Sequence, residues 1–139
     1  MAKVELKGWP DQTVSDYEPL PGLENAVADL HRAIRYDPQN CGAHYRLGLV
    51  AVRSFDFTSA GEEFEQAYAD NPYHRGIRKA LGYCDIWLGE IGDAVEVLAE
   101  IPEAGYEMST YAWWWDTQGQ TALSQRASLF VQRVDYTGE

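Results

Sequence analysis

The chain of 139 residues is long enough for one domain with its own core, and 45% hydrophobic with 24% charged residues is an ordinary globular composition. Its 22 acidic and 11 basic residues give a net charge of −11, which disfavours nucleic acid and anionic membranes as partners. No apolar run could span a membrane, and the N-terminus lacks the apolar stretch of a signal peptide, so we expect a cytoplasmic protein.

The first 22 residues are expected to be extended or partly disordered, because Pro10, Pro19 and Pro21 exclude a long helix. The apolar side chains of this segment are Trp9, Val14, Tyr17 and Leu20. We expect them to cover the first helix of the folded part, so that deletion of the segment would expose an apolar face.

From residue 23 onward the sequence repeats itself with a step of about 34 residues. The recurring positions are Ala26, Ala60 and Ala94; Leu30, Phe64 and Leu98; Leu47-Gly48 and Leu81-Gly82; and Pro38 and Pro72. Within a unit, the recurring residues have the spacing of one helix face. A fixed step of this length predicts stacked helix–turn–helix units.

The predicted helices span residues 23–36, 41–54, 58–70, 75–88, 92–101 and 109–133. Asn40 is well placed to cap the helix that begins at Cys41. Breakers at Phe55-Asp56-Phe57 and Gly89-Glu90-Ile91 separate the two helices of each unit, and Pro102 shortens the second helix of its unit. Residues 135–139 are expected to be a frayed tail.

The register of the last predicted helix is ambiguous. Continuing the same step places Asp116 on the position of Gly48 and Gly82. An insertion of three residues places Gly119 there instead and brings Trp115 and Ala122 into the pattern, and we favour this second register.

The unit from Cys41 to His74 carries the motif most completely, at Leu47, Gly48, Ala60, Phe64, Ala67 and Pro72. This pattern resembles the tetratricopeptide repeat family over residues 23–108. His44 replaces the usual Trp, Ala51 the usual Tyr, and Asp85 is an acid at the Tyr position of the next unit. The resemblance implies an all-α, right-handed superhelical domain over residues 23–134. It would contain about two full repeats, a half repeat before them and a C-terminal helix.

No residue constellation points to catalysis. Cys41 and His44 lie one helical turn apart, but two ligands do not make a metal site. The chain has no nucleophile elbow, phosphate-binding loop or zinc-protease motif. Asp85 and Asp116 are expected on buried helix faces, where a hydrogen bond or ion pair is the simpler role. We therefore expect no enzyme, no cofactor and no metal.

The resemblance implies that the first helix of each unit lines a concave, ligand-binding groove. The residues that would line it are Tyr45, Leu49, Val52, Arg53, Lys79, Tyr83, Ile86, Trp87, Trp113 and Gln120. Lys79, Tyr83 and Trp87 follow one another at four-residue spacing and would form a ridge. A suited ligand would offer an apolar residue to Trp87 and an acidic group to Lys79 or Arg53.

The leading functional hypothesis is a non-enzymatic interaction module that binds a peptide segment of a partner protein in this groove. Aromatic and arginine side chains are typical anchors of such interfaces. One alternative is a small acidic chaperone for a secreted or assembling client. Another is a unit that forms homodimers through its irregular ends, for which Trp113, Trp114 and Trp115 would be suited.

Overall fold

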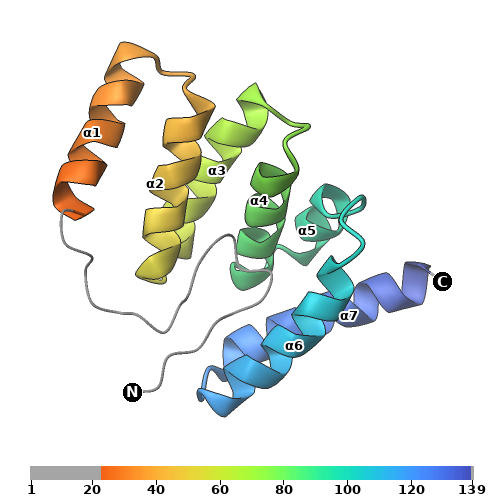
Figure 1. The fold of residues 1–139 in the computed structure, drawn as a ribbon. Coiled ribbons are helices and arrows are strands. Elements are labelled where there is room, and N and C mark those ends of the chain that lie inside the picture. The colour runs from red at the N-terminus through yellow and green to blue at the C-terminus, as the bar shows by residue number, and fades with distance from the viewer. Residues whose placement is uncertain (1–22, 139) are drawn as a thin grey trace. The chain divides into compact units, whose positions relative to one another are not determined.

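The computed structural model describes residues 23–138, and within this range it contains seven α-helices and no strand (Figure 1). The helices are α1 (Leu23–Tyr36), α2 (Cys41–Arg53), α3 (Phe57–Asp70), α4 (Arg75–Trp87), α5 (Ile91–Val97), α6 (Ala104–Thr117) and α7 (Thr121–Gly138). The all-α class is confirmed, and the first four helices match their predicted bounds to within a residue. The right-handed sense of the superhelix stays a prediction, and the predicted N-terminal segment lies outside the described residues.

The helices belong to two compact units that meet within α4, between Arg78 and Lys79. Unit 1 contains α1, α2, α3 and the first turn of α4. Unit 2 contains the rest of α4 together with α5, α6 and α7.

Unit 1 is built on the close pairing of α2 and α3 (Figure 1). The approach depends on Gly48, because a Cβ atom there would lie 2.6 Å from Cδ1 of Phe64, far inside van der Waals contact. Phe64, Ala60 and Ala67 are completely buried in this pairing. α1 packs on α2, and none of the α1 side chains that the structure describes is buried.

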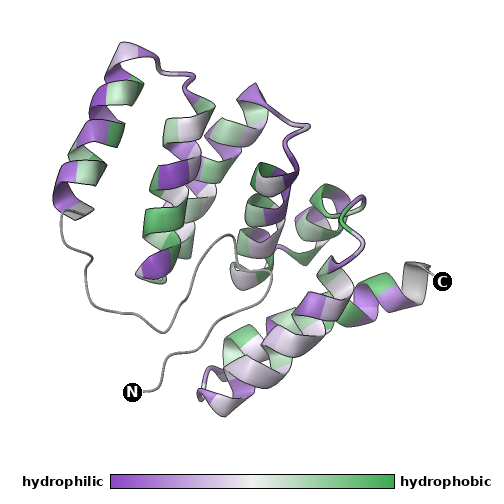
Figure 2. Cartoon of the chain, viewed as in Figure 1, coloured by the Kyte–Doolittle hydropathy of each residue, from purple (hydrophilic) through white to green (hydrophobic). Residues whose placement is uncertain are grey.

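Unit 2 repeats this contact and adds an aromatic core. A Cβ atom on Gly82 would lie 2.5 Å from Cδ2 of Leu98, so α4 and α5 meet as α2 and α3 do. α7 packs along α6 and also contacts α5. Although α6 contributes large side chains to the core, it is pale in Figure 2 because its many aromatic residues score near the middle of the hydropathy scale.

The first helix of each pair ends in the same way. Phe55, Gly89 and Gly119 follow α2, α4 and α6 and have φ values of 61°, 85° and 75°. The next amide donates back over five residues in each case, for example from Glu90 N to the Asp85 carbonyl at 2.8 Å. This is the Schellman arrangement, which satisfies the last carbonyls of a helix.

Side chains cap the starts of α2 and α4 at equivalent positions. The Asn40 side chain accepts a hydrogen bond from Ala43 N at 3.0 Å, which confirms the predicted cap. His74, the equivalent residue of the next unit, accepts one from Ile77 N through Nδ1 at 3.1 Å.

The prediction of a single helix over 109–133 is wrong. The chain forms two helices, α6 and α7, because Gly119 adopts a positive φ and turns the chain between them. Predicted to end at 134, the helical part continues to Gly138, and the frayed tail expected for residues 135–139 stays a prediction. With α6 and α7 the chain has a third helix pair in place of one C-terminal helix.

Both predicted registers for this region are also wrong. Gly48 and Gly82 lie seven residues before Phe55 and Gly89, and the equivalent residue before Gly119 is Ala112. The step from Gly89 to Gly119 is therefore about one helical turn shorter than the step from Phe55 to Gly89. The missing turn belongs to α5, which has 7 residues where α3 has 14 and ends at Val97 rather than at the predicted 101.

Candidate functional site

In unit 1, the predicted groove residues divide into exposed and buried ones. Leu49 and Val52 are buried. Tyr45 is half-buried, with its ring centroid 6.0 Å from that of Phe64 and 6.1 Å from that of His74. Arg53 is half-buried at the end of α2. Tyr45 and Arg53 are thus the two predicted residues of unit 1 that offer side-chain surface to a ligand.

Next to Tyr45, His44 joins three elements of unit 1. Its Nδ1 lies 2.7 Å from Oε1 of Glu63 on α3, and its Nε2 lies 2.9 Å from the Pro38 carbonyl oxygen in the α1–α2 turn. Burial alone lowers the pKa of His44, but the hydrogen bonds to Glu63 and Pro38 and the charges of Glu63 and Asp70 outweigh it and raise the pKa above its usual value. At the position where the family usually has Trp, this chain therefore has His44, which makes polar contacts with Glu63 and Pro38.

In unit 2, Lys79 lies within a cluster of four residues, which we call the Lys79 cluster. Its Nζ is 3.2 Å from Oε2 of Glu103 and 3.0 Å from Oε1 of Glu107. The Tyr83 hydroxyl donates to the same Glu107 oxygen, and Lys79 Nζ lies 5.6 Å from the centre of the Tyr83 ring. Two carboxylates against one ammonium leave the cluster with a net negative charge. The acidic ligand group expected from the sequence for Lys79 stays a prediction, and in the structure Lys79 is already paired with these two carboxylates.

Tyr83 and Trp87 of the predicted ridge, together with Ile86 of the predicted groove, point into the core of unit 2. Tyr83, Ile86 and Trp87 have exposed fractions of 1%, 0% and 2%. The Trp87 ring meets those of Tyr111 and Trp115 edge-on, with centroids 5.3 Å and 5.7 Å apart. The side chains expected to contact a ligand are therefore packed against α6 in this structure.

The burial of this ridge follows from the register of α6. Because α6 begins at Ala104 instead of the predicted 109, Tyr111 and Trp115 reach Tyr83 and Trp87. Tyr111 is so deeply buried that desolvation, its main perturbation, raises its pKa, and the phenol stays neutral.

Trp113 and Gln120 are the exposed members of the predicted groove in unit 2. Trp113 lies on α6 with 67% of its surface exposed, and Gln120 lies in the α6–α7 turn. Asp85 is buried as expected, whereas Asp116 is exposed, because the shifted register turns it away from the core.

Glu103 and Glu107 of the Lys79 cluster were not among the residues predicted to bind a ligand. The two acids lie four residues apart in the sequence, and acidic residues are favoured in the first turn of a helix, so this pair could have indicated the start of α6. The predicted start of this helix, residue 109, lies five residues after the observed start, so both acids fell outside the predicted helix.

The described residues show neither a metal cluster nor a membrane-spanning helix. No group of three or more His, Cys, Asp or Glu side chains between residues 23 and 138 is placed to hold a metal ion. None of the helices in the same part of the chain combines the length and apolarity needed to cross a membrane. Cys41 is half-buried and Cys84 is buried, and both are free thiols.

The comparisons with known proteins agree with the repeat seen in the structure. A family model described as tetratricopeptide repeat matches residues 51–112. The comparisons with curated proteins and with solved structures give no significant match. The matched range runs from the last residues of α2 through α3, α4 and α5 to α6, the helices that share the glycine contact and the helix-end geometry. Residues 51–112 of this chain therefore match the tetratricopeptide repeat family.

Proposed function

We propose that this protein is a non-enzymatic interaction module that binds a peptide segment of a partner protein through the first helices of its repeats. The observation that carries the proposal is the tetratricopeptide repeat over residues 51–112, a repeat type that generally binds proteins. The accessible side chains of the predicted groove support it with groups suited to peptide recognition.

In unit 2 the binding surface consists of the Lys79 cluster and Trp113. Lys79, Glu103 and Glu107 are partly exposed, so the ammonium can donate to a peptide carbonyl and the carboxylates can accept from peptide amides or basic side chains, whereas Tyr83 is buried and positions Glu107. Trp113, which lies on α6 as Glu107 does, offers an exposed indole. In unit 1 the corresponding residues are Tyr45 and Arg53.

The experiment that tests this function is a quantitative affinity capture read by mass spectrometry. We expect Trp113→Ala to lose a partner that the unchanged protein retains, because an exposed aromatic anchor contributes strongly to an interface. The matched control is Tyr73→Ala, which removes an even more exposed aromatic side chain, 88% accessible, from the α3–α4 turn. Capture of the same partners by all three proteins would contradict the proposed surface.

Self-association is the second candidate, and the exposure of Trp113 is the observation that favours it. The net charge of −11 opposes it, because two copies repel each other. Light scattering during size-exclusion chromatography decides between the two. A dimer that Trp113→Ala converts to a monomer would replace partner binding as the role of this residue.

A further inference from the structure

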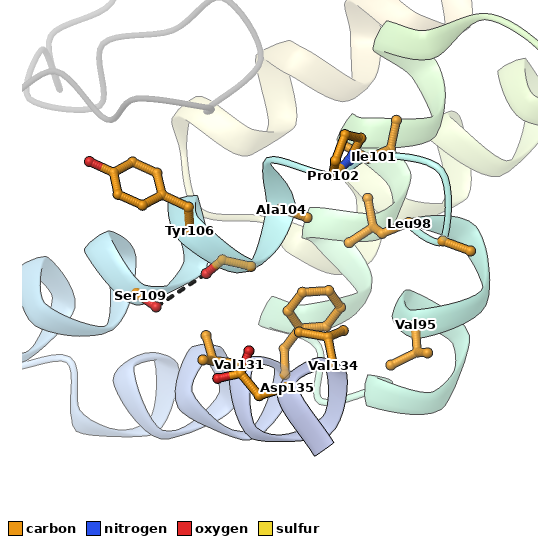
Figure 3. A pocket seen from close by; sticks show the side chains of 13 residues that line it. Val95, Leu98, Ile101, Pro102, Ala104, Tyr106, Ser109, Val131, Val134 and Asp135 are labelled. Atoms are coloured by element: carbon orange, nitrogen blue, oxygen red, sulfur yellow. Dashed lines mark hydrogen bonds between the residues drawn. The ribbon is translucent and has the colours of Figure 1, made fainter. Parts of the chain in front are cut away.

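We propose that unit 2 contains a second binding site, an apolar cleft that receives the apolar side chains of a basic peptide segment from a partner protein. The proposal rests on the protein-binding function proposed above and adds a site to it. The cleft has a volume of about 560 Å³ and lies between α5, the beginning of α6 and the last turns of α7 (Figure 3).

The cleft exists because the three helices around it differ in length. α5 ends after 7 residues, whereas α7 runs for 18 residues and continues beside the beginning of α6. Gly105 of α6 faces α7 here, since a Cβ atom there would make an ordinary van der Waals contact with Val134 Cγ2 at 3.5 Å. The space that the missing turn of α5 would fill is left open.

Most of the cleft wall is apolar. Figure 3 shows Leu98 and Val95 on one side and Val131 and Val134 on the other. Leu98 is buried, but the half-buried Val95, Val131 and Val134 expose apolar surface that favours an occupant with apolar side chains, because covering it removes water from both partners. A volume of several hundred Å³ is that of a ligand-binding pocket, so it admits more than one side chain.

The charge of the cleft and of its surroundings points to a basic occupant. Asp135 is the one charged residue among those that line the cleft, and it is exposed. Between residues 79 and 138 there are nine acidic and three basic residues. Of the basic ones, Lys79 is held by two carboxylates, and Arg126 donates to the Trp87 carbonyl at 2.6 Å. A second copy of this chain would bring like charge, whereas a lysine- or arginine-bearing segment is complementary.

Tyr106 supplies an aromatic contact at the edge of the same cleft. It is 78% exposed, and Figure 3 shows its ring directed outward, away from Leu98 and Val134. Tyrosine is enriched at interface hot spots, and its ring can pack over a peptide whose apolar side chains enter the cleft.

The test uses a defined synthetic peptide in place of an unidentified partner. The peptide is a fluorescently labelled twelve-residue helix former with leucines at positions i, i+3, i+4 and i+7 and lysines elsewhere. A second peptide replaces every lysine with glutamate. Fluorescence anisotropy at about 0.15 M salt gives both affinities under conditions that screen non-specific attraction between surface charges. We expect the lysine peptide to bind and the glutamate peptide to bind at least about tenfold more weakly.

Two substitutions and their matched controls locate the binding. Ala99 is exposed and lines the cleft, so Ala99→Trp fills it from the edge and should weaken the lysine peptide about tenfold or more. Asp135→Asn should weaken it about threefold. The controls make the same changes on exposed residues that do not line the cleft, as Ala122→Trp and Asp116→Asn, and should leave the affinity unchanged.

Each of the other outcomes overturns the proposal. Equal binding by all variants would show attraction to the acidic surface as a whole, and equal binding of both peptides would show an apolar site without charge preference. A dimer that Ala99→Trp dissociates would make a second copy the occupant.

If Ala99→Trp does not fold, amide shifts of the unchanged protein decide, since peptide-induced shifts away from Gly105, Val134 and Asp135 exclude the cleft. Ala99→Trp changes the cleft and Trp113→Ala changes the surface of the proposed function, so failure of this site and failure of the proposed function are seen separately.

Discussion

One missing methyl group determines how closely α2 and α3 pack. Gly48 faces the Phe64 ring, and Gly82, one repeat later, faces Leu98 in the same manner. The neighbours of these glycines are fully buried, so they cannot move aside into solvent. This is the physical reason why the two glycines recur in the sequence.

Gly48→Ala is therefore expected to destabilise the protein by about 1–3 kcal/mol, the usual cost of overpacking a core. Denaturant unfolding followed by circular dichroism measures this change. Gly42→Ala is the matched control on the same helix, because a Cβ atom there meets the end of the flexible Arg46 side chain at 3.2 Å and Asn40 Oδ1 at an ordinary contact distance of 3.6 Å. If the two variants are equally stable, close packing at Gly48 is not what holds α2 and α3 together.

His44 makes the stability of unit 1 depend on pH. Its two ring nitrogens both face acceptors, Glu63 and the Pro38 carbonyl, and only a doubly protonated imidazole can donate to both. The pKa of His44 is raised in the folded state, so its contribution is complete below the unfolded value of about 6.5 and is lost as the pH rises through the folded value.

We expect the denaturant concentration at half-unfolding to decrease as the pH rises above about 6.5, and His44→Gln to reduce this slope. His31→Gln changes a histidine that is exposed on α1 and should keep the slope of the unchanged protein. An identical slope in all three proteins would mean that another group causes the pH dependence.

At the scale of the elements, the ends of the first helices follow one rule that the sequence shows only in part. Gly89 and Gly119 occupy the positive-φ position after α4 and α6, where glycine is the usual residue. Phe55 holds the same position after α2 with φ 61°, although a side chain there is strained by about 1 kcal/mol. A search for glycine finds two of these ends and misses the third.

Gly89→Ala should destabilise the protein by about 1 kcal/mol. The cost arises from the backbone, because the nearest atom to a Cβ there is Nε of the flexible Arg126 side chain at 3.4 Å. Gly92→Ala, in the first turn of α5, is the control and should be neutral or stabilising, since alanine is the better helix former. Thermal unfolding compares the two, and equal melting temperatures would contradict the proposed role of the positive φ.

The elements also show where prediction from the sequence succeeds and where it fails. α1 to α4 were predictable because the regular repeat step, the Asn40 cap and the breakers agree with one another. α6 and α7 were not, because Gly119 can be placed either in a helix or in the turn between two helices. The same error affected the predicted groove. Tyr83 and Trp87 belong to a predictable helix, but their burial depends on where α6 begins.

At the scale of the whole molecule, a net charge of −11 combines with a small set of exposed aromatic side chains. Tyr106 and Trp113 lie on α6 of unit 2, which is more acidic than basic, and Tyr73 lies in the α3–α4 turn of unit 1. We therefore expect α6 to recognise the partner and the recognised segment to be basic.

Site-specific photo-crosslinking tests this central claim most directly. Benzoylphenylalanine is placed at position 106, 113 or 73, one position at a time, and the crosslinked peptides are identified by mass spectrometry. If α6 recognises a basic segment, positions 106 and 113 should give adducts with partner segments rich in lysine and arginine, and position 73 should give none. Adducts that form only at position 73, or only with acidic segments or further copies of this chain, would contradict it.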